Sequence, residues 1–170
     1  LAAEGGDLDE VVTVDVDGLN MGRSTVMGII PGDEFTLRDL LYGLMLPSGN
    51  DAALAIARHL SGHESVFSEE MTALAWRLGL TDSTFTNPHG LGGAGHATTA
   101  YDLAVLSRYL MTFPDLAEIV AAKSWTAEGS RTIRMWTLNS LLHTYPGADG
   151  LKTGYTRRAG PTIAVSAVRE

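Results

Sequence analysis

Cysteine is absent from the 170-residue sequence, which excludes disulfides, thiol nucleophiles and thiolate metal sites. Long apolar runs are absent too. The longest hydrophobic helix candidate closes at Leu46 and is ended by Pro47, well short of the roughly 20 residues that a membrane-spanning helix needs. Basic residues are few, 12 against 20 acidic ones, so the formal net charge is −8 and we expect no nucleic-acid partner.

The N-terminus carries no recognisable targeting signal. Residues 1–4, Leu-Ala-Ala-Glu, lack both the basic start and the apolar stretch of a signal peptide. The sequence is therefore expected to be cytoplasmic, or a mature or trimmed piece of an exported protein. The same residues are typical of the tail of a helix that Gly5-Gly6 terminates, which predicts that earlier turns of this helix precede Leu1.

Strands are predicted at both ends of the chain. Residues 11–16 are β-branched and partly alternating, and residues 25–30 are their expected partner. A hairpin is expected from 123–126 and 131–135, and two more strands from 150–156 and 162–168.

Four helices are predicted between these strands from the spacing of apolar residues. They are expected after Thr36, from Asp51 to Leu60, from Ser65 to Gly79, and from Thr99 to before Pro114. Thr36, Ser65 and Thr99 are the expected N-caps. Asp39 and Asp102 stand where the capping-box partner of Thr36 and Thr99 belongs. Strands around a helical middle indicate an α+β fold, with a helical lobe at 36–112 against antiparallel strands at 148–170.

Two short motifs could carry chemistry. Ser48-Gly49-Asn50 lies at a proline-broken corner between two helices, so both polar side chains can project from it. Lys152-Thr153-Gly154 lies in a glycine-bracketed strand, where the bare Gly154 would let another backbone approach the strand edge. A cation, a hydroxyl and a bare edge predict a clamp for an extended peptide that ends in a carboxylate.

Set in their context, the motifs resemble a known family. The sequence is similar to the low-molecular-mass penicillin-binding D-alanyl-D-alanine carboxypeptidases, peptidase family S11. The similar parts follow the same order in the chain: 40–53, Asn87-Pro88-His89-Gly90-Leu91 with 98–104, 138–142 and 147–156. The resemblance implies a β-lactamase-like and penicillin-binding-protein-like fold. It also implies peptidoglycan stem peptides ending in D-Ala-D-Ala as substrates, β-lactams as ligands, an extracytoplasmic location, and no cofactor or metal.

Site roles follow from the same resemblance. Ser48 would carry a proton between a lysine base and the leaving amine, and Asn50 would hold the substrate amide. Lys152 and Thr153 would bind the substrate carboxylate beside Gly154. The backbone N–H of Tyr155 would be one oxyanion donor. Arg157 and Arg158 would add only long-range attraction, and His89 is expected to shape its loop by hydrogen bonding.

The sequence departs from the family at the nucleophile. The family places it in a Ser-x-x-Lys motif upstream of the second motif, but the only serine before Ser48 is Ser24, and Met27 stands where the lysine belongs. We therefore expect the motif before Leu1, a chain truncated at both ends, and no activity from these 170 residues alone. Sheet edges exposed by truncation would favour a homodimer.

Two other functions remain open. A β-lactamase would use the same acyl-enzyme chemistry, although no Glu-x-x-Leu-Asn segment for deacylation is found. A catalytically dead ligand-binding module of the same fold would also lack the nucleophile. A metal site at His59 and His63 is disfavoured, because Gly62 ends their helix and no third ligand is apparent.

Overall fold

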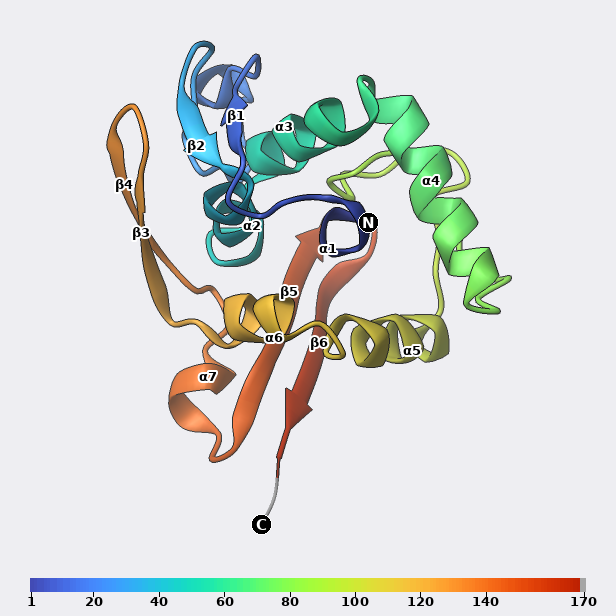
Figure 1. Cartoon of the computed structure of the whole chain (residues 1–170). Helices are drawn as coiled ribbons and strands as arrows, with labels where there is room; N and C mark the ends of the chain where they lie inside the picture. The colour runs from blue at the N-terminus through green and yellow to red at the C-terminus, as the bar shows by residue number, and fades with distance from the viewer. Residues whose placement is uncertain (169–170) are drawn as a thin grey trace.

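The computed structural model describes residues 1–168, with helices in the middle of the chain and strand pairs around them (Figure 1). In chain order the elements are α1 (Ala2–Gly5), β1 (Val11–Thr13), the 3-10 helix η1 (Gly18–Asn20), β2 (Glu34–Thr36), α2 (Leu37–Met45), α3 (Asn50–Ser61), α4 (Glu64–Arg77), α5 (Ala100–Leu110), α6 (Pro114–Ala121), β3 (Ser124–Glu128), β4 (Thr132–Trp136), α7 (Leu141–Thr144), β5 (Ala148–Thr156) and β6 (Gly160–Ala167). The α+β class that the sequence predicted is confirmed.

All the strand pairs are antiparallel, and one differs from the prediction. β3 pairs with β4 in the predicted hairpin, and the two strands predicted near the end of the chain, β5 and β6, pair with each other. β1, however, stops at Thr13 and pairs with β2, placing Val12 opposite Phe35. Residues 25–30 form no strand, because the backbone N–H groups of 27–29 are taken by a side chain, the carboxylate of Asp51, rather than by β1.

Two threonine caps are confirmed, but their aspartates act elsewhere. Thr36 Oγ1 accepts from the N–H of Asp39, and the carboxylate of Asp39 accepts from Trp125 Nε1 at 2.7 Å. Trp125 also stacks on Tyr42 with ring centroids 3.9 Å apart, so β3 is held against α2. Thr99 caps α5 in the same way as Thr36 caps α2. In α5 the carboxylate of Asp102 accepts from Ser83, which lies in the loop after α4.

Two helix starts were predicted wrongly or missed. α4 begins at Glu64, and its cap is His63, whose Nδ1 accepts from the N–H of Ser65; Ser65 itself is not the cap. α6 was not predicted, because Pro114 was read as the end of a helix. In the structure Pro114 is its first residue, where the missing N–H costs nothing.

The core joins the helical middle to β5. Phe35, Leu37 and Leu40 are fully buried between β2, α2 and α3. α6 crosses β5 (Figure 1), and a Cβ at Gly150 would lie 2.9 Å from Val120, so the bare Gly150 permits this close packing. Because α6 contacts α2 as well as β5, it fixes these two elements relative to each other.

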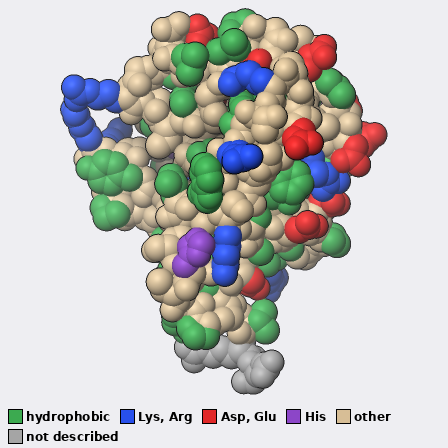
Figure 2. Space-filling model, turned by 90° about the vertical axis from the view of Figure 1, so that its left-hand side faces the viewer, with side chains coloured by type: hydrophobic (Ala, Val, Ile, Leu, Met, Phe, Trp, Pro, Cys, Tyr) green, Lys and Arg blue, Asp and Glu red, His purple; other side chains and the backbone are tan. Residues whose placement is uncertain are grey.

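The surface drawn in Figure 2 mixes acidic, basic and apolar side chains. Within residues 1–168 no helix combines the length and the apolar character needed to cross a membrane. The division into a helical lobe at 36–112 and strands at 148–170 stays a prediction, and residues 169–170 of it lie outside the described part of the chain.

Candidate active site

Ser48 occupies a strained corner between α2 and α3. Its φ of 60° makes it the one non-glycine residue of the described chain in the left-handed region, at a cost of about 1–3 kcal/mol. Three hydrogen bonds hold the corner. Thr25 Oγ1 donates to the Ser48 carbonyl at 2.7 Å, the N–H of Asn50 donates to the Thr25 carbonyl at 2.9 Å, and the N–H of Gly49 donates to Gly43 at 2.9 Å. These three contacts hold Ser48 in its left-handed conformation.

Lys152 reaches this corner from β5. Its Nζ donates to Ser48 Oγ at 2.7 Å and to the carbonyl of Thr153 at 2.8 Å. Burial of the side chain lowers the pKa of Lys152 from its ordinary value to about 8, because the charged form loses hydration. A lysine with this pKa remains mostly cationic at pH 7, yet its proton is far easier to move than that of an exposed lysine.

Asn50 turns its side chain toward the segment before residue 30. Its Nδ2 donates to Ser24 Oγ. The position of Ser24 beside Asn50 was not predicted from the sequence. No local pattern signals this contact, because it joins residues that are 26 positions apart.

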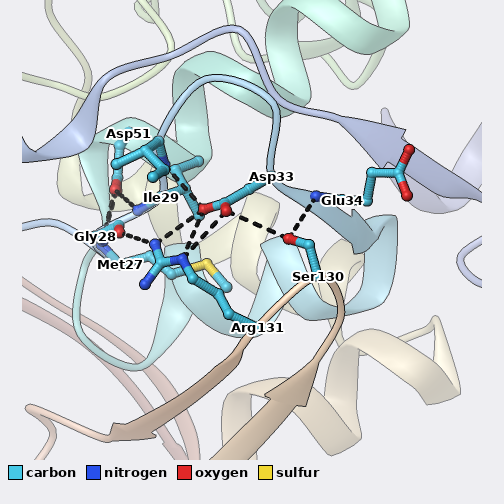
Figure 3. Close-up of polar contacts among 9 residues, drawn as sticks. Met27, Gly28, Ile29, Asp33, Glu34, Asp51, Ser130 and Arg131 are labelled. Carbon is cyan, nitrogen blue, oxygen red and sulfur yellow. Dashed lines mark hydrogen bonds and ion pairs between the residues drawn. The ribbon is translucent and has the colours of Figure 1, made fainter.

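Asp51 was also not predicted as a site residue, and its side chain holds the segment that contacts the Ser48 corner. Its side chain is fully buried and accepts from the N–H groups of Met27, Gly28 and Ile29 at 2.8, 2.7 and 3.1 Å (Figure 3). A Cβ at Gly18 would lie 2.2 Å from its Oδ2, so only glycine fits there. In the sequence Asp51 resembles an ordinary acidic residue in the first turn of a helix.

The other expected substrate-binding residues follow Lys152 along β5. Thr153 is half-buried, whereas Tyr155 is 71% exposed. The approach of another backbone to Gly154 stays a prediction, and a Cβ at this position would lie 2.7 Å from the hydroxyl of Thr162 on β6. The structure thus brings Lys152 to Ser48, whereas the side chain of Asn50 contacts Ser24, and residues 153–155 continue along β5.

The residues kept out of the site have other partners. His89 Nδ1 accepts from the N–H of Leu91, which confirms its expected role in shaping the loop. His59 pairs with Glu10 at 3.1 Å and His63 caps α4, and residues 1–168 contain no cluster of His, Asp and Glu suited to a metal ion. Arg157 and Arg158 lie exposed in the turn between β5 and β6.

The arrangement can move a proton and hold an anion. The Ser48 hydroxyl can accept one hydrogen bond and donate another, so it can pass a proton between two groups that it touches. The ammonium group of Lys152 lies at the same corner, where a partly water-excluded site strengthens its attraction for a carboxylate. These capacities suit acyl transfer on a substrate that ends in a carboxylate.

Comparisons with known proteins show the family to which the chain is related. The sequence profile of peptidase S11, D-alanyl-D-alanine carboxypeptidase, matches residues 2–170. The chain is 40% identical over 167 residues to D-alanyl-D-alanine carboxypeptidase DacB2 of Mycobacterium tuberculosis, covering 96% of this chain and 56% of that protein. It is 35% identical over 150 residues to DacF of Bacillus subtilis, covering 87% of this chain and 38% of that protein.

Solved structures show the same fold. A crystal structure of D-alanyl-D-alanine carboxypeptidase from M. tuberculosis superposes with a TM-score of 0.91 at 39% identity, covering 99% of this chain and 64% of that one. The Streptomyces K15 DD-transpeptidase superposes with a TM-score of 0.89 at 33% identity, covering 96% and 68%. The chain spans less than two thirds of DacB2 or DacF. The expected penicillin-binding-protein fold is confirmed, and the chain belongs to the D-alanyl-D-alanine carboxypeptidase family, peptidase family S11.

Proposed function

We propose that residues 48–50 and 152–155 form the proton-relay and carboxylate-binding half of a serine D,D-carboxypeptidase site. The contact between Lys152 Nζ and Ser48 Oγ at 2.7 Å carries the proposal, because it joins the two motifs into one site. The substrate is a peptidoglycan stem peptide ending in D-Ala-D-Ala, and the product is free D-alanine. The nucleophile comes from a Ser-x-x-Lys motif outside these 170 residues.

The reaction consists of two acyl transfers, first from the substrate to the nucleophilic serine and then from the serine to water. The nucleophilic serine attacks the penultimate D-alanine carbonyl and gives its proton to the lysine base. The Ser48 hydroxyl donates a proton to the nitrogen of the leaving D-alanine and takes one from the base, so its own state is restored. Water then hydrolyses the ester and returns the serine, while Asn50 orients the substrate amide.

The substrate carboxylate is the group that Lys152 recognises. Its ammonium group and the Thr153 hydroxyl are the charge and the donor that a terminal carboxylate needs. The N–H of Tyr155 is the oxyanion donor of this half of the site. β-Lactams, which carry a comparable carboxylate, acylate the same serine, and the location that goes with this substrate is the cell envelope, outside the cytoplasm.

The test compares two proteins. One is the 170-residue chain, and the other is the same chain extended by the residues that its gene encodes before Leu1. We expect the extended protein to release D-alanine from diacetyl-L-Lys-D-Ala-D-Ala and to gain the mass of penicillin. The 170-residue chain should do neither. Acylation of the shorter chain contradicts the assignment of the nucleophile, and no D-alanine release by the extended protein favours a dead binding module.

We also propose that copies of the 170-residue chain associate through β5 and β6. Within residues 1–168 these strands form a two-stranded sheet with exposed apolar side chains, among them Ile163 and Val165. Unpaired strand edges favour pairing with another chain. Light scattering at rising concentration should show a dimer, and a monomer at high concentration contradicts this proposal.

A further inference from the structure

The segment 24–29 is hydrogen-bonded to the corner formed by Ser48 and Asn50. Ser24 accepts from Asn50, and Thr25 accepts from the Asn50 N–H and donates to the Ser48 carbonyl. The segment contributes to no strand, so no sheet ladder holds it. Further along, residues 27–29 are held by core packing of Met27 and Ile29, by the Gly18 N–H on the Ile29 carbonyl, and by two polar side chains.

The first set of hydrogen bonds to residues 27–29 comes from Asp51. The buried carboxylate of Asp51 accepts from three successive N–H groups, at Met27, Gly28 and Ile29 (Figure 3). Gly28 has a φ of 90°, which lets the chain curl around the carboxylate. These bonds pair the N–H groups of residues 27–29, and the carbonyl of Gly28 accepts from a different side chain.

The second set comes from the tip of the β3–β4 hairpin, about 100 residues away in sequence. Arg131 Nη2 donates to the Gly28 carbonyl, and the same guanidinium donates to both oxygens of Asp33, at 2.9–3.2 Å (Figure 3). Asp33 is 6% exposed. Burial would raise the pKa of this carboxyl, but Arg131 and the Ile30 N–H outweigh burial and lower it. The pair is therefore ionised at neutral pH.

We infer that Arg131 is a positioning residue for the proton relay, holding Gly28 against Asp51 and thereby holding Ser24 and Thr25 against Asn50 and Ser48. Its importance for catalysis rests on the proposed function, while its effect on the corner does not. The planar guanidinium is needed because it can bind a carboxylate and a carbonyl at once from fixed directions. A lysine here can keep the ion pair with Asp33 but cannot serve both groups in this geometry.

Amide hydrogen exchange of the 170-residue chain tests these contacts directly. In Arg131→Ala we expect the amides of Met27, Gly28, Ile29 and Asn50 to exchange about ten- to a hundredfold faster, as loss of a hydrogen bond to a charged group implies. Arg131→Lys keeps the hairpin docked and should show the same pattern, so a poorly folded alanine variant does not stop the test. Arg134→Ala, an exposed arginine on β4, is the matched control and should change none of these amides.

A second readout reports on the relay itself. The sequence contains two lysines, Lys123 and Lys152, so ¹³C-labelled lysine gives two resolvable titrations. In both Arg131 variants the pKa of Lys152 should rise from about 8 toward that of an exposed lysine, because a displaced corner no longer buries Nζ. The signal of Lys123 is the internal reference for the labelling.

The inference is overturned if both Arg131 variants leave these amides and the Lys152 titration unchanged. It is equally overturned if Arg134→Ala reproduces the effects, because the hairpin would then act only through general stability. Neither readout needs D-alanine release. If the extended protein releases no D-alanine, the proposed function is contradicted. The role of Arg131 in positioning the corner is still decided separately, by amide exchange and by the Lys152 titration.

Discussion

Lys152 Nζ donates a hydrogen bond to Ser48 Oγ at 2.7 Å although 104 residues separate the two in sequence. The contact requires α2 to end in a strained corner and β5 to be locked against α6 beside it. A polar pair that is brought together at the cost of strain and of lysine desolvation points to function, because neither cost stabilises the fold.

The buried lysine should make stability depend on pH. The folded pKa of Lys152, about 8, lies below its ordinary value of 10.5, so between these values the unfolded chain binds more protons. The free energy of unfolding should therefore rise with pH, by about 1–2 kcal/mol between pH 8 and 9.5. Urea unfolding at several pH values measures this slope. Lys152→Met should flatten it, and an unchanged slope in that variant would assign it to other groups.

The pH window is limited at its upper end by tyrosines. Burial raises the pKa of Tyr42, and the hydrogen bond to Glu4 raises that of Tyr109. Both acids keep their protons longer in the folded chain, so above about pH 10 they lower the free energy of unfolding as pH rises. The comparison with Lys152→Met therefore belongs below pH 9.5.

The left-handed backbone of Ser48 should be visible in a pair of variants. Ser48→Gly and Ser48→Ala both remove the hydroxyl that Lys152 binds, but only alanine keeps a Cβ at a φ of 60°. The left-handed conformation costs a Cβ-bearing residue about 1–2 kcal/mol, and glycine loses part of that gain as chain entropy. Ser48→Gly should therefore be about 0.5–1 kcal/mol more stable than Ser48→Ala in urea unfolding. Equal stabilities would show that the corner is not strained.

Asp51 should be among the most sensitive positions of the chain. Asp51→Ala leaves buried N–H groups at 27–29 without an acceptor, each at about 1–3 kcal/mol, so we expect a loss of at least about 3 kcal/mol. Asp9→Ala is the control, because its exposed ion pair with Arg38 is worth about 1 kcal/mol or less. Chemical denaturation compares the two. A loss below about 1 kcal/mol in Asp51→Ala would mean that segment 24–29 is held by other contacts.

The loop around His89 and His96 should loosen in acid. Burial lowers the pKa of both histidines, and each Nδ1 accepts a backbone N–H, from Leu91 and Thr86 respectively, which requires the neutral ring. Since their folded pKa values lie below 6.5, stability should fall as pH drops below about 6.5. Faster amide exchange at Thr86 and Leu91 at pH 5.5 than at pH 7.5, after correction for intrinsic rates, measures this.

A histidine control separates the loop from general acid effects. His143 is exposed on α7, so His143→Gln should leave the acid response unchanged. His89→Gln and His96→Gln should each weaken it. Acid exchange that is equally fast in all three variants and in the parent chain would contradict a role for these two rings.

Local patterns predicted much of the fold and the core of the site. Each of these predictions depends on a few neighbouring residues: the caps Thr36 and Thr99, the β3–β4 hairpin, the strands β5 and β6, and the motifs around Ser48 and Lys152. Contacts between distant side chains were not predictable in this way. Residues 25–30 have the composition of a strand, but Asp51, more than 20 positions away, takes their N–H groups.

The missed elements have equally specific causes. Pro114 ends a helix in one reading and begins one in the other, and only packing of α6 on β5 decides between them. Ser24 and Arg131 belong to no motif. Arg131 meets Gly28 only because the β3–β4 hairpin folds against it (Figure 3), and Ser24 meets Asn50 from 26 positions away.

The most direct measurement is the release of D-alanine from diacetyl-L-Lys-D-Ala-D-Ala by the extended protein, compared between Lys152→Met and Lys123→Met. Each variant removes one of the two lysines of this chain, and only Lys152 contacts Ser48. Loss of a preorganised electrostatic donor predicts a fall in kcat/KM of about 10²–10³ for Lys152→Met, with Lys123→Met close to the parent. Equal activities in the two variants would contradict the assignment of this site.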